Sequence, residues 1–264
     1  MRVLRSMPYL INSLTVNNSK LLKTELCAYS VEACRVAARL GVNRVELCAS
    51  PAEGGVTPSM ATIEQVAAIE GLDLSVMIRP RGGDFLYSDE EFQTMLRDIH
   101  YAREAGATGV VFGILTADGR VDVERTRALV EAAHGMETTF HRAVDMTEDY
   151  GAAVEAVIEA GCDRILTSGG YDKAIDGIDN VRRAVVISRG RIEIMAGSGV
   201  VAANAVALKN VGVDALHFSA KKMVVGGMQY RNPRISMGGS SAIDEFSLRV
   251  VDEAEVTEIL KLIR

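Results

Sequence analysis

The chain has 264 residues, of which 48% are hydrophobic and 24% are charged, close to the proportions of an average soluble globular protein. This composition excludes a disordered chain, and the length suits a closed α/β barrel, which typically needs about 250 residues. The net charge is −6, and no cluster of Lys and Arg forms the basic stripe that nucleic-acid binding requires. No apolar run is long enough to span a bilayer, so we expect neither a nucleic acid nor a membrane as partner.

Residues 1–21 are expected to form an irregular N-terminal extension. Arg2 and Arg5 precede a short apolar stretch that Asn12 interrupts, which makes the stretch too short for a signal peptide. The 4 cysteines are too few for a disulfide framework in a chain of this length. We therefore expect a reduced, cytoplasmic protein.

Eight short strands are predicted, each followed by a helix. Helix-to-strand junctions recur as a glycine followed four residues later by an apolar strand residue, at Gly41, Gly106, Gly161 and Gly212. The expected strands are Thr24–Tyr29, Arg44–Ala49, Leu74–Arg79, Val110–Leu115, Thr138–Arg142, Arg164–Ser168, Ile192–Gly197 and Ala215–Ser219. Strands that alternate with helices indicate βαβ units. Eight units without a boundary in composition favour a single-domain (β/α)₈ TIM barrel over residues 22–264 rather than an open, doubly wound sheet.

Two helix starts and one irregular segment stand out. Ser88 and Glu91 have the spacing of a capping box, and Asp252 with Glu255 is expected to open the last helix in the same way. Residues 220–243 have neither a helical nor a strand period, although several of them are apolar. Because long irregular segments in compact domains are usually functional, we expect a lid or a subunit contact here.

Alternation along the predicted strands places an unusual set of polar side chains inside the barrel. Successive side chains of a strand point to opposite faces, and barrel interiors normally hold branched apolar residues. The tetrapeptide Glu-Leu-Cys-Ala occurs at 25–28 and again at 46–49, so each copy points a carboxylate and a thiol inward. The inward-facing set is Glu25, Cys27, Tyr29, Glu46, Cys48, Arg79, His141, His217 and Ser219.

Buried charges are costly unless they are paired. Glu25, Glu46 and Arg79 are therefore expected to form an ion-paired cluster that His141 and His217 complete. Such a cluster can serve only to specify the fold. We favour an active or binding site, because barrels keep their sites at the C-terminal ends of the strands. In an enzyme, the two glutamates would act as acid and base, a histidine would transfer protons or bind a divalent metal, and Arg79 and Arg81 would hold an anion.

Glycine-rich loops follow three of the predicted strands. Such loops let backbone N–H groups converge on an anion, and the last loops of a barrel commonly hold phosphate, although tight turns alone also produce them. We predict that these loops bind a small anionic or phosphorylated, sugar-like ligand. The residues expected to contact it are Arg81, Ser168, Gly169, Gly197 and Gly199.

Cys27 and Cys48 are expected to lie close together on neighbouring strands. Paired thiols bind soft metals such as Cu(I), but the commonest role of a free cysteine is that of a small buried hydrophobe. On spacing alone we favour the hydrophobe, since no CxxC motif or flanking histidine strengthens a metal site. A nucleophilic cysteine, with His141 or His217 as its base, is a further option.

Several longer motifs resemble the CutC copper homeostasis family. They are Val45-Glu-Leu-Cys48 with Glu53-Gly-Gly-Val-Thr-Pro-Ser59, the run from Met77 to Ser88, Thr139-Phe-His-Arg-Ala143, and Arg164-Ile-Leu-Thr-Ser-Gly169. The likeness runs from about Leu22 to the C-terminus. Its Arg-Pro-Arg-Gly-Gly-Asp-Phe run is unusual enough to make chance agreement improbable.

The resemblance implies a cytoplasmic barrel that handles copper and forms homodimers or larger homo-oligomers. It also implies that Cys27 and Cys48 match the cysteines proposed as Cu(I) ligands, which makes copper the expected cofactor. One departure is Gly-Ser-Gly at 197–199, where the family is expected to have Gly-Ala-Gly or Gly-Gly-Gly. The interior charges resemble an enzyme site more than a metal carrier, so the sequence leaves open whether the chain is an enzyme.

Overall fold

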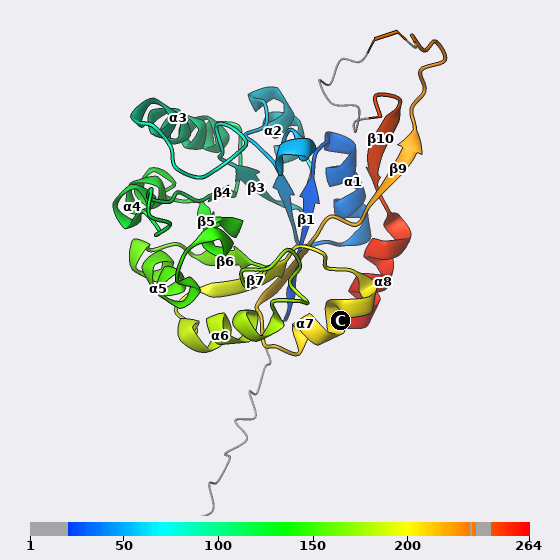
Figure 1. The fold of residues 1–264 in the computed structure, drawn as a ribbon. Helices are drawn as coiled ribbons and strands as arrows, with labels where there is room; N and C mark the ends of the chain where they lie inside the picture. The colour runs from blue at the N-terminus through cyan, green and yellow to red at the C-terminus, as the bar shows by residue number, and fades with distance from the viewer. Residues whose placement is uncertain (1–20, 233, 236–243) are drawn as a thin grey trace, which may run out of the picture.

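The computed structural model describes residues 21–232, 234–235 and 244–264, and in them eight parallel strands close into a barrel (Figure 1). Each strand pairs with the next, and β8 pairs with β1 to complete the ring. The predicted (β/α)₈ TIM barrel is therefore confirmed. The strands are β1 Lys23–Ala28, β2 Arg44–Leu47, β3 Asp73–Met77, β4 Gly109–Phe112, β5 Glu137–Phe140, β6 Arg164–Thr167, β7 Glu193–Gly197 and β8 Ala215–Phe218.

Helices surround the barrel (Figure 1). They bury the outward-facing side chains of its strands. Val45, Ile165 and Ile194 belong to this apolar layer and are fully buried in it. The described helices are α1 Val31–Leu40, α2 Met60–Ala67, α3 Asp89–Glu104, α4 Val123–Ala132, α5 Tyr150–Ala160, α6 Ile178–Ser188, α7 Ala202–Lys209 and α8 Glu253–Ile263, with short 3₁₀ turns at Pro51–Glu53 and Arg142–Met146. None of them is long and apolar enough to cross a membrane.

The local signals at helix ends have mixed outcomes. Gly41 follows α1 with a φ of +76°, as the recurring junction predicts. The capping box at α3 is confirmed, since the Glu91 amide donates to the Ser88 hydroxyl and the Ser88 amide donates to the Glu91 carboxylate. Asp252 caps α8, but the expected role of Glu255 there is wrong. Its carboxylate accepts instead from the Ala202 amide at the start of α7, 2.7 Å away, so it caps a neighbouring helix.

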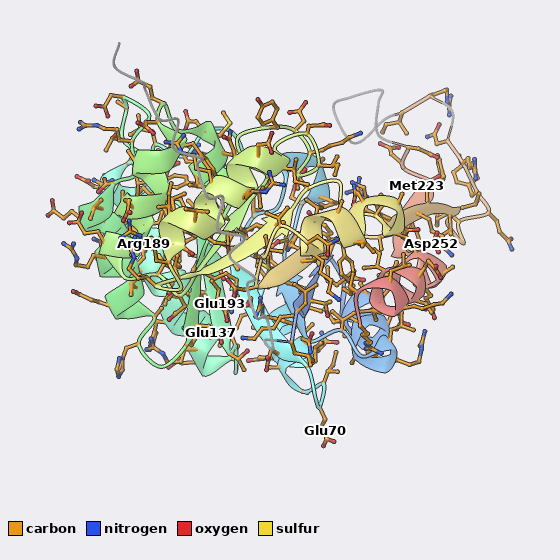
Figure 2. The ribbon with its side chains drawn as sticks, turned by 90° about the horizontal axis from the view of Figure 1, so that it is seen from below. Glu70, Glu137, Arg189, Glu193, Met223 and Asp252 are labelled. Carbon is orange, nitrogen blue, oxygen red and sulfur yellow. The ribbon has the colours of Figure 1, made fainter. Side chains whose placement is uncertain are left out.

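Part of the segment expected to be irregular forms a strand. Lys221–Val225 is β9, and it pairs antiparallel with β10, Ser247–Val251, in a hairpin that projects beside the barrel (Figure 1). All five residues of β9 are exposed, so the sequence has no alternation of polar and apolar residues that would mark a strand here. Met223 lies on this hairpin, to one side of the barrel and near Asp252 (Figure 2). Residues 233 and 236–243 lie outside the described residues, as do residues 1–20 of the expected extension, so a lid, a subunit contact and an irregular N-terminus stay predictions.

Candidate functional site

A cavity of about 1090 Å³ opens at the C-terminal ends of the barrel strands. Its lining includes Cys27 from β1, Glu46 from β2 and His217 from β8, together with loop residues that follow the strands. This is the end of the barrel where the sequence predicts a site, and where enzymes with this fold bind their substrates.

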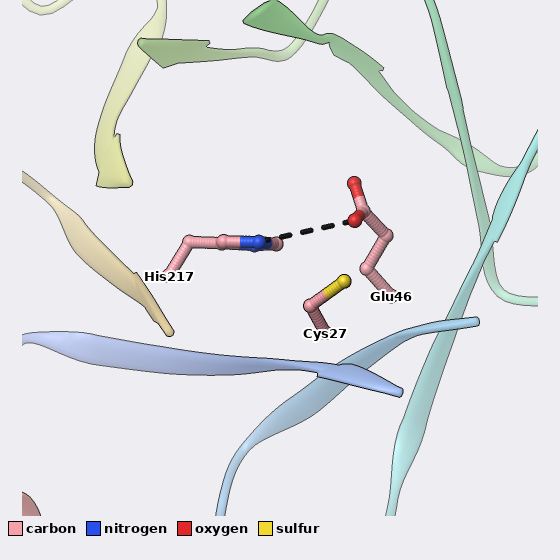
Figure 3. Close-up of side chains that lie close together, drawn as sticks. All are labelled: Cys27, Glu46 and His217. Carbon is pink, nitrogen blue, oxygen red and sulfur yellow. Dashed lines mark ion pairs between the residues drawn. The ribbon is translucent and has the colours of Figure 1, made fainter. Parts of the chain in front are cut away.

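Three of the inward-facing residues meet at the cavity (Figure 3). The Cys27 thiol, a Glu46 carboxylate oxygen and a ring nitrogen of His217 all lie within 4.8 Å of one another. The residues come from β8, β1 and β2, which are neighbours because β8 closes the barrel against β1. Cys27 pairs in register with Glu46, which places their inward-facing side chains next to each other.

The His217 ring is held in one orientation by Glu25. Its Nδ1 lies 2.8 Å from Glu25 Oε1, and its Nε2 lies 3.9 Å from Glu46 Oε2. The second oxygen of Glu25 accepts a hydrogen bond from Arg44 Nε. Glu25 is fully buried, so this carboxylate depends on its two partners, and they leave Nε2 of His217 facing Glu46 and Cys27.

Electrostatics in this cluster follow from burial and close charges. Burial opposes the ionisation of Glu25, but His217 and Arg44 outweigh it and hold the pKa of Glu25 at about 2. Burial raises the pKa of Glu46 to about 8. Burial also works against the charge on His217, but Glu46, Cys27 and Glu25 raise its pKa well above the usual range. A hydrogen bond with Cys48 is the main reason why the pKa of the Cys27 thiol is well below its ordinary value.

Cys48 lies directly behind this cluster. Its thiol donates a hydrogen bond of 3.5 Å to Glu46 Oε2, and its side chain packs with Met77, Val111 and Cys27. All four cysteines of the chain are free thiols. The two thiols predicted to lie on neighbouring strands are therefore in one sulfur-rich cluster, of which Cys27 and Met77 line the cavity.

Arg79 does not pair with the glutamates, so this part of the predicted ion-paired cluster is wrong. Its guanidinium is buried and lies above the ring of Phe85, with 5.1 Å between Cζ and the ring centroid. A guanidinium is planar and holds its N–H donors in a fixed geometry, and here its hydrogen bonds connect the loops after β2 and β3. The groups that accept its hydrogen bonds are the backbone carbonyls of Glu53, Gly55 and Gly83, at 2.7, 2.9 and 2.8 Å.

Arg44 takes the position that Arg79 was expected to fill. Its side chain is 2% exposed and contacts Glu25 in the barrel interior. Residues 44, 46 and 48 point the same way because side chains alternate along β2. The alternation that predicted inward-facing Glu46 and Cys48 could therefore also have predicted an inward-facing Arg44. Arg164, which begins β6 as Arg44 begins β2, pairs with Glu137 and Glu193 at the starts of β5 and β7; Figure 2 labels both glutamates.

His141 also stays apart from the glutamates, contrary to the prediction that it completes their cluster. Its ring packs against Phe85, with 4.9 Å between centroids, and its Nδ1 accepts the Ala143 amide at 3.2 Å. Burial, with a contribution from the Arg79 charge, lowers the pKa of His141 to about 3. The ring is therefore neutral at pH 7, and its proton is on Nε2.

Three buried polar atoms of cavity-lining residues have no hydrogen-bond partner among the residues that the structure describes. They are Glu46 Oε1, Arg79 Nε and His141 Nε2. An unsatisfied buried polar atom costs about 1–3 kcal/mol and is rare in native proteins. Three of them around one cavity indicate that the cavity is shaped for a polar ligand.

Most of the loop residues predicted to hold an anion have protein partners instead. The Ser168 amide and hydroxyl both donate to Asp145, and the Gly169 amide donates to Thr167 Oγ1. Arg81 is paired with Glu91 and Asp84. Asp145 thus supplies the negative charge that the loop after β6 was expected to take from a ligand. Among the predicted anion-binding residues, Gly199 lines the cavity, whereas Arg81, Ser168, Gly169 and Gly197 are not part of its lining.

A family model described as the CutC family matches residues 22–222 of this chain. The chain belongs to the CutC family. A CutC family protein of Bacteroides fragilis is 45% identical over 241 residues, which cover 90% of this chain and 96% of the relative. The human copper homeostasis protein cutC homolog is 42% identical over 233 residues, which cover 88% of this chain and 85% of the relative.

A solved structure agrees with this assignment. The crystal structure of CutC from Streptococcus agalactiae matches with a TM-score of 0.71 and 34% identity, over 75% of this chain and 99% of that one. The family assignment brings copper homeostasis into consideration, and the geometry of the cavity decides which residues of this CutC protein are suited to a metal.

Proposed function

We propose that this CutC family protein is a cytoplasmic copper homeostasis protein that binds Cu(I) through the thiols of Cys27 and Cys48. The observation that carries the proposal is the packing of the Cys27 and Cys48 side chains in one cluster with the Met77 thioether, beside the cavity that Cys27 and Met77 line. The names of the relatives, which include a human copper homeostasis protein, support a role in copper handling.

The chemistry of the two thiols suits Cu(I). Soft thiolate ligands select this ion, and the thioether of Met77 packs against Cys48 as a further soft group. A thiol must lose its proton to become a ligand, and the lowered pKa of Cys27 makes this step easier at one of the two sulfurs. A reducing cytoplasm keeps both thiols available, which agrees with the free state of the cysteines.

Competitive titration of the reduced protein with Cu(I) and a chromogenic chelator tests this proposal. We expect one tightly bound Cu(I) per chain, and a loss of affinity of at least about 100-fold in the Cys27→Ser, Cys48→Ser double variant, equivalent to about 2.7 kcal/mol. The matched control is Cys34→Ser, Cys162→Ser, because these thiols are also buried but lie outside the cluster that holds Cys27 and Cys48. An affinity that is the same in wild type and in the Cys27, Cys48 double variant would refute the proposal.

A second candidate function is an enzyme that acts on a small anionic or phosphorylated metabolite. The volume of the cavity favours it, because about 1090 Å³ is far more than a metal ion fills. The unpaired Nε of Arg79 and Nε2 of His141 would donate to an anion, and both are among the atoms without a partner in the described part of the chain.

A thermal-shift screen of small organic anions separates the two functions. A true ligand at 100 times its Kd is expected to stabilise the wild type by about 2.7 kcal/mol. His141→Asn keeps an acceptor near the position of Nδ1 but removes the Nε2 donor, whereas His141→Gln keeps a donor near Nε2. We expect the shift to disappear in His141→Asn and to survive in His141→Gln, and an equal shift in all three proteins would contradict a role for His141.

A further inference from the structure

We propose that Cys27, Glu46 and His217 form a site for a divalent cation of the zinc class, with an open coordination position toward the cavity. The proposal goes beyond Cu(I) binding by the thiol pair, because it uses a different set of ligands. Cys27 belongs to both sets, so the two metals would compete for the chain.

The three ligand atoms have the chemistry and spacing of such a site. Zinc accepts a thiolate, a carboxylate and an imidazole, whereas Cu(I) favours sulfur. Bonds of about 2.0–2.3 Å in a tetrahedral site place ligand atoms roughly 3.3–3.8 Å apart. His217 Nε2 and Glu46 Oε2 are already 3.9 Å apart, and no pair of the three ligand atoms exceeds 4.8 Å. A closure of about 1 Å or less would complete the coordination geometry.

The residues behind the ligands support the same inference. A metal-binding histidine usually donates its second ring nitrogen to a carboxylate, which fixes the ring and directs the free nitrogen to the metal. His217 has this arrangement with Glu25, at 2.8 Å, and Arg44 in turn holds Glu25. Glu46 is held by the Cys48 thiol, through its Oε2. Each of these two ligands therefore has a second hydrogen-bonded residue that limits its motion.

The fourth side of the cluster faces the cavity rather than another protein ligand. All three residues line that cavity, and Glu46 Oε1 has no partner in the part of the chain that the structure describes. Structural zinc sites are closed by four protein ligands, whereas sites with three leave a position for water or substrate. The geometry thus matches an open site, where a cation would contact a molecule bound in the cavity.

Titration of the metal-free, reduced protein with Co²⁺ tests the proposal. Cobalt replaces zinc in such sites, and its bond to a thiolate produces a near-ultraviolet charge-transfer band that reports the Cys27 ligand. We expect this band in the wild type and its loss in Cys27→Ser. In Glu46→Gln, the Co²⁺ affinity should fall at least about 10-fold, the lower limit even for residues behind the ligands. Far-ultraviolet circular dichroism and unfolding midpoints establish that each variant folds.

Two variants separate this site from the Cu(I) pair. Glu46→Gln should lower the affinity for Co²⁺ and leave the affinity for Cu(I) unchanged, because the two thiols remain. Cys48→Ser should lower the affinity for Cu(I) and leave the affinity for Co²⁺ unchanged, since the serine hydroxyl can still donate a hydrogen bond to Glu46. Cys162→Ser, away from the cavity, should change the affinity for neither metal.

The outcomes decide the two proposals independently. Co²⁺ binding that is equal in wild type and Glu46→Gln, or that lacks the thiolate band, overturns the divalent site, whatever the result with Cu(I). Should Glu46→Gln fail to fold, His217→Gln is measured in its place, and an unchanged Co²⁺ affinity there overturns the site equally. Loss of Cu(I) binding in Cys48→Ser, with Co²⁺ retained, supports both sites at once.

Discussion

Replacing Arg44 with methionine is expected to destabilise the protein by about 3–5 kcal/mol, because it removes one of the two cationic partners of the buried Glu25 carboxylate. Arg44 and Glu25 are 2% and 0% exposed, and the hydrogen bond between them lies in the barrel interior. Urea unfolding at pH 7 measures the change. Removing both charges, in the Glu25→Leu, Arg44→Met double variant, should recover part of the loss, since replacing a whole buried pair by apolar residues is far less costly than breaking it.

The pH dependence of stability provides a second measure of the same pair. The pKa of Glu25 is about 2 in the folded protein, below its ordinary value of 4.5. A lowered pKa means that its contribution to stability is complete above pH 4.5 and is lost as the pH falls toward 2. In Arg44→Met the folded-state pKa should rise, so stability at pH 7 should fall more than stability at pH 3. Arg39→Met is the control, because Arg39 pairs with Glu253 at the surface, and it should leave the unfolding midpoint nearly unchanged. Equal effects of the two substitutions would contradict the role given to Arg44.

Gly169→Ala is expected to destabilise the protein far more than Gly170→Ala, although the two glycines are adjacent. Both have positive φ, +74° and +79°, so an alanine at either position costs roughly 1–2 kcal/mol. A Cβ on Gly169 would lie 2.3 Å from the carbonyl oxygen of Gly177, whereas one on Gly170 would have its nearest neighbour at 3.9 Å. Backbone cannot move aside as a side chain can, so we expect a further 1–3 kcal/mol or so at Gly169.

Chemical unfolding of the two glycine variants measures this difference directly. The Gly169→Ala variant should also disturb the loop in which Ser168 and Gly170 donate to Asp145, since the clash forces the loop away from Gly177. Equal stabilities for the two variants would show that the loop adapts to the added methyl group, and would contradict the close approach on which the prediction rests.

The sequence was sufficient for the fold and for the direction of the interior side chains. Glycine-terminated helices that alternate with short apolar strands indicated βαβ units, and eight such units favoured the barrel over an open sheet. The period of two along a strand is a local property, so it correctly pointed Glu25, Cys27, Glu46 and His217 into the barrel. Strand β9 was not predicted, because all of its residues are exposed and its sequence therefore lacks the alternation of polar and apolar residues that marks a half-buried strand.

Only the tertiary structure decided which interior side chains meet. Register sets the height of each one along the barrel axis. Glu46 is level with Ser75 on β3, so Arg79, four residues further on, lies roughly 13 Å higher along the strand and above the glutamate layer. Closure of the barrel, in contrast, brings His217 beside Glu25 across 192 positions of sequence. Alternation determines the face on which a side chain lies, but stagger and closure depend on all the strands together, and these long-range pairings selected Cys27, Glu46 and His217 as neighbours.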